Sequence, residues 1–172
     1  MRKIASSFIL ACFVLSGSPA LAEGLTAKDK PSEVADFELD DVKGKTVKLS
    51  SYKGKVVAIS FWASWCEPCK QELKFLHQYK KSNPDKDFEI IAVATDAPET
   101  ISKVKSIVKR KKWKFAVPLD TEGKVSALLN PRGATPFAMF VDKSGKLAYS
   151  NEGFKSGDEE KYKPLINTLL GE

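Results

Sequence analysis

Apolar and charged residues alternate in two neighbouring segments, 36–41 ("DFELDD") and 46–50 ("TVKLS"). Alternation with a period of two is typical of a strand with one buried face. A short Lys-Gly-Lys break at 43–45 lies between the two segments, and a glycine in such a position indicates a turn. The pattern therefore predicts an N-terminal β-hairpin.

Further along the chain, the apolar residues form continuous runs. The runs 56–62 ("VVAISFW"), 88–95 ("FEIIAVAT") and 137–142 ("FAMFVD") are rich in β-branched and aromatic residues and show no clean alternation. Such runs are typical of strands that are buried on both faces of a sheet. A turn after 142 predicts a hairpin partner at 147–151, and 115–120 ("FAVPLD") is expected to be a short extended segment.

Four other segments show the spacing of amphipathic helices, with apolar residues three or four positions apart. They are 70–82, 98–112, 122–130 and 158–170. Strands that alternate with helices indicate an α/β domain. We therefore expect a central mixed sheet with helices on both faces, preceded by the hairpin.

The first residues have the layout of a secretory signal peptide. Arg2 and Lys3 precede a short apolar stretch at 4–15, and Ala20-Leu21-Ala22 has the small residues of a cleavage site. The apolar stretch is shorter than the ~20 residues that span a bilayer. Cleavage after Ala22 is therefore expected, with a retained anchor or lipidation at Cys12 as the alternatives.

Cleavage would divide the chain into a signal peptide at 1–22, a flexible N-terminal tail at 23–33 and one domain at 34–172. A domain of that size is common for a single core. The chain is mildly basic, with a formal net charge of +6. This charge alone does not imply nucleic acid, and we expect none as a partner of an exported protein.

An exported protein works where disulfides persist. After cleavage the chain keeps two cysteines, Cys66 and Cys69, within "FWASWCEPCK". A disulfide between them would close too short a loop to stabilise the fold much. A structural zinc site needs four ligands, and the chain adds only His77 to the two thiols. We therefore predict a reactive dithiol and no metal, with copper(I) binding as an alternative because soft thiolates suit that ion.

Cys66 is predicted to lie where a buried strand ends and a helix begins. Free backbone N–H groups and the helix dipole at that place favour the thiolate, so the pKa of Cys66 should be lowered. Cys69, one turn later, should be more buried and should resolve the mixed disulfide that Cys66 forms.

Three stretches in this order resemble the thioredoxin superfamily, and in particular its exported TlpA/ResA-like branch. They are the hairpin segment, "VVAISFWASWCEPCKQEL" and "GATPFAMFVDKSGKL". The resemblance implies a thioredoxin-like fold and a redox-active disulfide without any other cofactor. It also implies that Cys66 attacks, that Cys69 resolves, and that Pro136 is a cis-proline facing them.

The same resemblance suggests which residues line the substrate groove. Thr135 would offer its backbone to an extended substrate, and Trp65 an apolar surface beside the dithiol. Glu67 and Pro68 lie between the cysteines, and the Glu67 charge should raise the pKa of Cys66 and favour a reductant.

One position departs from the pattern of thioredoxins proper. Ser60 stands where those proteins have a buried aspartate that accepts the proton of the resolving cysteine. In the TlpA/ResA-like branch an acid from the segment after the next strand can take this part. Asp96 and Glu99 are the candidates, with Asp96 preferred and a helix-capping role for Asp96 as the alternative.

These observations predict a monomeric thiol-disulfide oxidoreductase in the periplasm. It would reduce cysteine pairs of exported proteins. The resemblance implies that apocytochrome c during cytochrome c maturation is one such substrate, and that the electrons come from a membrane thiol reductase. A copper(I) metallochaperone and a thiol peroxidase-like antioxidant protein are the alternatives.

A basic run in and after the helix at 98–112 has two interpretations. The simpler one is a solvated helix face with cations near the helix C-terminus. The other is a docking surface for an acidic partner or an anionic membrane. The cations are Lys103, Lys105, Lys109, Arg110, Lys111 and Lys112.

Overall fold

The computed structural model describes residues 26–172. The predicted signal peptide, 1–22, lies outside the described residues. The strands are β1 (Thr26–Glu33), β2 (Glu38–Asp40), β3 (Thr46–Lys48), β4 (Val56–Trp62), β5 (Phe88–Ala94), β6 (Phe137–Val141) and β7 (Lys146–Glu152). The helices are η1 (Leu49–Tyr52), α1 (Glu67–Ser82), η2 (Pro98–Thr100), α2 (Ile101–Lys111), α3 (Lys124–Leu129) and α4 (Glu159–Leu170).

Five of these strands form one mixed sheet in the order β1-β7-β6-β4-β5. β4 pairs in parallel with β5 and antiparallel with β6. β2 and β3 form a separate antiparallel hairpin, as predicted. The sheet therefore holds β4 at its centre, and the chain leaves the end of β4 directly toward α1.

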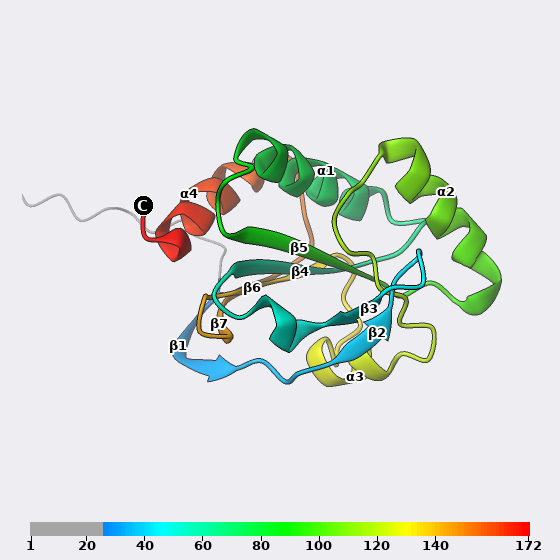
Figure 1. Ribbon diagram of the computed structural model, residues 1–172, viewed down its shortest axis with the longest axis horizontal. Coiled ribbons are helices and arrows are strands. Elements are labelled where there is room, and N and C mark those ends of the chain that lie inside the picture. The colour runs from blue at the N-terminus through cyan, green and yellow to red at the C-terminus, as the bar shows by residue number, and fades with distance from the viewer. Residues whose placement is uncertain (1–25) are drawn as a thin grey trace, which may run out of the picture.

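The sheet separates two hydrophobic cores, and β4 contributes to both. Val56, Ala58 and Trp62 face the core that contains side chains of α1, α2 and α4. Val57 and Ile59, between them in sequence, face the core under β2–β3, η1 and α3. Figure 1 shows these two layers on opposite sides of the sheet. Burial on both faces explains why this strand is apolar throughout.

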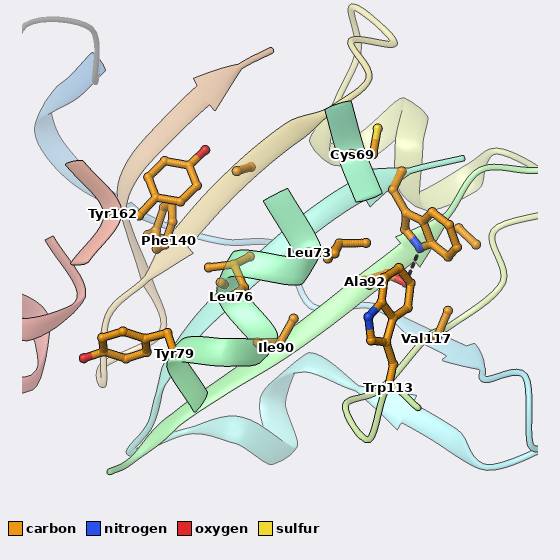
Figure 2. Close-up of a cluster of buried hydrophobic side chains, with 14 of the residues drawn as sticks. Cys69, Leu73, Leu76, Tyr79, Ile90, Ala92, Trp113, Val117, Phe140 and Tyr162 are labelled. Carbon is orange, nitrogen blue, oxygen red and sulfur yellow. Dashed lines mark hydrogen bonds between the residues drawn. The ribbon is translucent and has the colours of Figure 1, made fainter. Parts of the chain in front are cut away.

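The core on the α1 side is closely packed with aromatic rings (Figure 2). Trp62 and Trp113 meet edge to face, with their ring centroids 5.2 Å apart. The indole N–H of Trp62 donates to the carbonyl of Ala92 at 3.2 Å, so this buried polar group is satisfied. Leu73 and Leu76 of α1 are fully buried above β4 and β5. This packing fixes the first turns of α1 against the sheet.

The predicted elements are confirmed with one correction. The predicted flexible tail at 23–33 is wrong for its described part, because 26–33 forms strand β1 along β7. The pairing uses the free backbone edge of β7, which needs no hydrophobic pattern from the added strand. The register shifts between Ala27 and Ser32, around Pro31, and an edge strand tolerates a proline.

Candidate active site

The dithiol lies at the junction of β4 and α1. Cys66 is the residue that caps the N-terminus of α1, and Cys69 lies in the first turn of the helix. Their sulfur atoms form a disulfide, with 5.4 Å between the two Cα atoms. The predicted position of Cys66, between a buried strand and a helix, is therefore confirmed.

The surroundings of the two sulfur atoms differ. The Sγ atom of Cys66 accepts a hydrogen bond from the backbone N–H of Cys69 at 3.2 Å. Cys66 is 3% exposed and Cys69 is 0% exposed. Backbone donors at a helix N-terminus stabilise negative charge. The arrangement therefore favours a thiolate on Cys66, the cysteine nearer to solvent.

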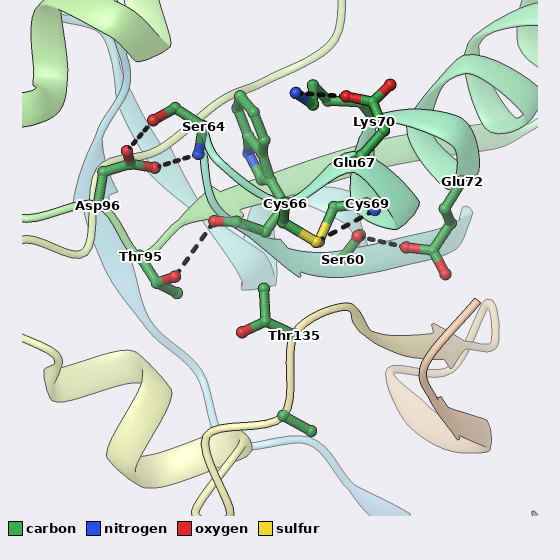
Figure 3. The surroundings of a disulfide bond; sticks show 12 residues. Ser60, Ser64, Cys66, Glu67, Cys69, Lys70, Glu72, Thr95, Asp96 and Thr135 are labelled. Atoms are coloured by element: carbon green, nitrogen blue, oxygen red, sulfur yellow. Dashed lines mark hydrogen bonds and ion pairs between the residues drawn. A yellow bond between two sulfur atoms is a disulfide. The ribbon is translucent and has the colours of Figure 1, made fainter. Parts of the chain in front are cut away.

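Thr135 faces the disulfide from across the site (Figure 3). The peptide bond between Thr135 and Pro136 is cis, as the resemblance implied. Among residues 26–172, the backbone N–H and C=O of Thr135 have no hydrogen-bond partner. Next to the dithiol, Trp65 is 74% exposed although it is a large apolar side chain. An extended peptide could therefore find both backbone partners and an apolar contact here.

The negative charge of Glu67, beside the dithiol, is paired with a neighbouring lysine. Its carboxylate forms an ion pair with Lys70 at 2.7 Å. The hydrogen bond and the charge of Lys70 lower the pKa of Glu67, with a smaller contribution from Lys111. The nearby cation offsets the negative charge beside Cys66. The effect of Glu67 on the thiolate is therefore smaller than the sequence alone predicts, while Pro68 is exposed beside it.

A buried acid that was not predicted from the sequence lies one turn beyond Cys69. The hydroxyl of Ser60 donates to Glu72 Oε2 at 2.6 Å, and the hydroxyl of Tyr162 donates to Oε1 at 2.8 Å. Glu72 is 0% exposed. Residues three apart on a helix are neighbours, so Glu72 lies on the same side of α1 as Cys69. Figure 3 shows Ser60 between the disulfide and Glu72 in this view.

Burial changes the acidity of this network. Desolvation raises the pKa of Glu72 to about 7, although its two hydrogen bonds oppose the shift. Burial and the neighbouring Glu72 carboxyl raise the pKa of Tyr162 far above its ordinary value, so this phenol remains a donor. A carboxyl group with a pKa near neutrality can both accept and return a proton at physiological pH.

The two acids predicted from the sequence, Asp96 and Glu99, are not part of the Glu72 network. Asp96 is buried and accepts hydrogen bonds from the backbone N–H and the hydroxyl of Ser64, two residues before Cys66. It also accepts from the hydroxyl of Thr100, but from no helix backbone N–H among the described residues. Glu99 is exposed on η2. Asp96 therefore holds the turn that leads into the dithiol.

The sequence did contain a signal for Glu72. Its distance of three residues from Cys69 places it on the buried side of the helix that Leu73 and Leu76 define. The amphipathic pattern alone does not show which charged side chain of this helix is buried. Ser60, a polar residue within an otherwise apolar strand, was the second sign that a polar partner lies opposite.

Other ionisable groups near the site do not form a metal site. Within residues 26–172, no cluster of three or more His, Cys, Asp or Glu side chains could hold a metal ion. His77 is half-buried on α1, and its ring meets that of Phe115 at 5.7 Å. The redox group is the Cys66–Cys69 pair itself.

Within residues 26–172, no helix has the length and apolar character needed to cross a bilayer.

The mixed sheet, the covering helices and the disulfide at the start of α1 define a thiol-disulfide oxidoreductase with a thioredoxin-like fold. The sequence profile of the AhpC/TSA family matches residues 31–150. The chain therefore belongs to the AhpC/TSA family, and its relatives point to the ResA/DsbE type within the thioredoxin-like proteins.

Three of the similar proteins have names that describe thiol-disulfide exchange. The chain is 31% identical over 159 residues to the thiol-disulfide oxidoreductase ResA of Bacillus cereus (strain ATCC 10987 / NRS 248), covering 88% of this chain and 89% of the relative. It is 33% identical over 131 residues to ResA of Bacillus subtilis (strain 168), covering 70% and 68%. A crystal structure assigned as the thiol:disulfide interchange protein DsbE of Chlorobium tepidum has a TM-score of 0.76 and 31% identity, covering 83% of this chain and 99% of that chain.

Proposed function

We propose that this oxidoreductase works outside the cytoplasm and reduces disulfides of exported proteins through Cys66 and Cys69. The observation that carries the proposal is the position of Cys66 at the N-terminus of α1, with its sulfur atom hydrogen-bonded to a backbone N–H. A thiolate stabilised in this way is nucleophilic near neutral pH. The signal-like residues at 1–22 support export.

The reaction takes two exchange steps. The Cys66 thiolate attacks one sulfur of the substrate disulfide, forms a mixed disulfide and releases the other substrate sulfur as a thiolate. Cys69 then loses its proton and attacks the Cys66 sulfur. The second substrate thiolate leaves, and the Cys66–Cys69 disulfide forms. Two electrons pass to the substrate, and the enzyme ends in the oxidised state.

Glu72 is our candidate for the group that takes the proton of Cys69. It lies one helical turn from Cys69, is fully buried and has a pKa of about 7. A base with a pKa near the working pH is the most effective one. Asp96 was the preferred candidate from the sequence, but its oxygens are occupied by the hydroxyl and backbone of Ser64.

The oxidised enzyme needs electrons before it can act again. In a compartment where disulfides persist, the electrons that reduce this enzyme must come from outside that compartment. We propose a membrane thiol reductase as the donor. Within the class of exported substrates, the TlpA/ResA-like resemblance nominates an apocytochrome c with an oxidised cysteine pair as the first to test.

Trapping tests the roles of the two cysteines. The Cys69→Ala variant should accumulate a mixed disulfide between Cys66 and its substrate, because the resolving thiol is absent. The Cys66→Ala variant should trap nothing. Both variants would be expressed with the leader, and adducts would be identified by non-reducing gels and mass spectrometry. Equal trapping by the two variants would contradict the assignment, and the trapped proteins identify the substrate.

Direction and reaction type need separate measurements. We expect the reduced protein to reduce insulin disulfides and to have a reduction potential well below the roughly −120 mV of a strong oxidant. A potential near that value would contradict a reductase. Stoichiometric copper without disulfide turnover would indicate a metallochaperone. Faster turnover of hydrogen peroxide than of disulfides would indicate a thiol peroxidase.

A further inference from the structure

The cations of the chain are concentrated in one segment. Residues 101–119 contain seven cations and no acid, whereas the whole chain has a formal net charge of +6. The rest of the chain is therefore slightly acidic. All seven side chains are exposed, and within residues 26–172 none of them forms an ion pair. The cations are Lys103, Lys105, Lys109, Arg110, Lys111, Lys112 and Lys114.

Part of this charge surrounds a groove between α2 and the β2–β3 turn. The groove has a volume of about 420 Å³, and Val42, Val108 and Trp113 provide its apolar lining. The turn is held against this segment by a hydrogen bond from the N–H of Val42 to the carbonyl of Val117 at 3.1 Å. Five lysines border the groove: Lys43, Lys105, Lys109, Lys112 and Lys114. We call these eight residues the basic groove.

Repulsion between the lysines of the basic groove raises the free energy of the protein when no partner is bound. Lys105 and Lys109 are four residues apart on α2, and like charges at this spacing repel. Lys112 adds a third ammonium group one turn further along the same side of the helix. Among the described residues, no acid forms an ion pair with Lys105, Lys109 or Lys112, so no direct partner offsets this repulsion. An acidic partner would therefore gain attraction and relieve repulsion.

Lys112 also has an unfavourable backbone. Its φ is 53° and its ψ is 38°, the left-handed region, at the C-terminus of α2. Glycine is the usual residue in this position because it has no side chain to clash. Strained residues often mark functional positions, so a lysine here suggests a role for its side chain.

One ring contact and one neighbouring lysine connect the basic groove with the region of the dithiol. Trp113 in the groove packs against Trp62, four residues before Cys66. Lys111, at the end of α2, is near enough to Glu67 to act on its carboxyl. A partner seated in the groove would therefore reach the face that carries Cys66 and Trp65.

We propose that the basic groove docks an acidic segment of a partner protein, with carboxylates on the lysines and one apolar side chain on the floor. The concave, apolar floor favours a peptide over a flat lipid surface. This inference rests on the proposed function, because the docked partner would be the protein whose cysteines react at Cys66. It assigns the chemical character of that partner.

Binding would be measured with a synthetic peptide that carries several glutamates, one leucine and a disulfide. The matched peptide has glutamine for each glutamate. The protein would be the Cys66→Ser/Cys69→Ser variant, so that no thiol exchange occurs, and the readout isothermal titration calorimetry. We expect the acidic peptide to bind at least tenfold more tightly, with an affinity that falls as salt is added.

The test variant combines Lys105→Gln, Lys109→Gln and Lys112→Gly in that background. We expect it to lose about tenfold in affinity for the acidic peptide. Lys112→Gly alone should lose about twofold while keeping or raising the melting temperature, because glycine relieves the left-handed backbone. Unchanged affinity in either variant would contradict the proposal.

The control variant removes the same charge from other surfaces, by Lys53→Gln, Lys155→Gln and Lys163→Gln. It should keep the affinity of the unmodified background. An equal loss in both triple variants would show attraction to net charge only and would overturn the groove assignment. Equal binding of the acidic and matched peptides would also overturn it.

Two further outcomes separate the possible partners and the two proposals. Vesicles of phosphatidylglycerol that bind more tightly than the acidic peptide, and that the test variant no longer binds, would overturn the peptide in favour of a membrane. Reduction of the matched peptide by the unmodified dithiol is measured separately. Its absence would contradict the proposed function and leave the docking result unaffected.

Discussion

The carboxyl group of Glu72 makes the stability of the fold depend on pH. Its pKa is about 7 in the folded protein, against an ordinary value of 4.5. Between these values the folded protein holds a proton that the unfolded chain has released. The free energy of unfolding therefore falls as the pH rises through this window, by about 3 kcal/mol in total. Below pH 4.5, Glu72 is protonated in the folded and the unfolded chain, so its titration no longer lowers the free energy of unfolding.

Glu72→Gln should remove this dependence. Glutamine keeps the size of the side chain and can still bond both Ser60 and Tyr162. We expect the unfolding free energy of the oxidised wild type, measured in urea, to fall by about 2–3 kcal/mol more than that of the variant between pH 5 and pH 8. All other titrating groups are shared, so the difference reports Glu72. Parallel pH profiles for the two proteins would show that Glu72 does not titrate in this range.

The same substitution separates the two candidate proton acceptors. If Glu72 takes the proton of Cys69, Glu72→Gln should slow the resolving step by 10²- to 10⁴-fold and remove its pH dependence near 7. Asp96→Asn should leave that pH dependence in place, because asparagine can still accept from the backbone N–H of Ser64. The rate of mixed-disulfide resolution would be followed by stopped flow. The reverse result would restore Asp96 as the acceptor.

Trp65 is a residue whose effect should be on binding alone. It is 74% exposed, so Trp65→Ala should change the free energy of unfolding by less than about 0.5 kcal/mol. Loss of its apolar surface should raise KM for a protein disulfide several-fold with little change in kcat. Steady-state reduction of insulin would measure both. An unchanged KM would exclude Trp65 from the substrate contact.

At the scale of elements, the hydrophobic pattern predicted β4, β5, β6 and the four helices because their burial depends on side chains. β1 escaped prediction because strand pairing with β7 uses backbone groups, which leave no hydrophobic pattern in the sequence. Only some residues of the candidate active site could be predicted from the sequence. The cysteines and the cis-proline occupy recognisable sequence positions, whereas the buried Glu72 is held by Ser60 of the preceding strand and by Tyr162, 90 residues further along the chain.

A buried hydrogen bond from Tyr162 of α4 to Glu72 of α1 joins these two helices, beside the partly buried one from Tyr79 to Asn167. Tyr162→Phe keeps the ring, which packs edge to face on Phe140 at 4.8 Å, and removes only the donor. We expect a loss of about 1–3 kcal/mol in unfolding free energy at pH 8, where Glu72 is ionised. The loss should be smaller at pH 5. Chemical denaturation at both values checks this, and a loss independent of pH would point to ring packing instead.

At the scale of the whole molecule, the two cores meet at one strand. β4 is buried on both faces and has strands on both sides, so its amides can open only when the domain unfolds. β1 has a neighbour on one side and an interrupted register. We therefore expect the slowest hydrogen exchange in 56–62 and much faster exchange in 26–33. Exchange followed by mass spectrometry tests this, and equal rates would contradict the central role of β4.

The overall architecture could be predicted because strands and helices alternate along the chain. The basic groove could not, because it needs the β2–β3 turn and the end of α2, which are distant in sequence, to meet in space. The cations themselves were visible in the sequence. Their arrangement around an apolar floor was not, since that depends on how the hairpin packs against the sheet and on the hydrogen bond from Val42.

Cys69 and Glu72 belong to the same helix, one turn apart. A shift or tilt of α1 when a substrate docks would carry the thiol and the carboxyl together and leave their separation unchanged. An acid supplied by a strand would stay behind when the helix moved. A movement of α1 would therefore keep the proposed acceptor beside Cys69, while the bonds from Ser60 of β4 and Tyr162 of α4 to Glu72 would resist that movement.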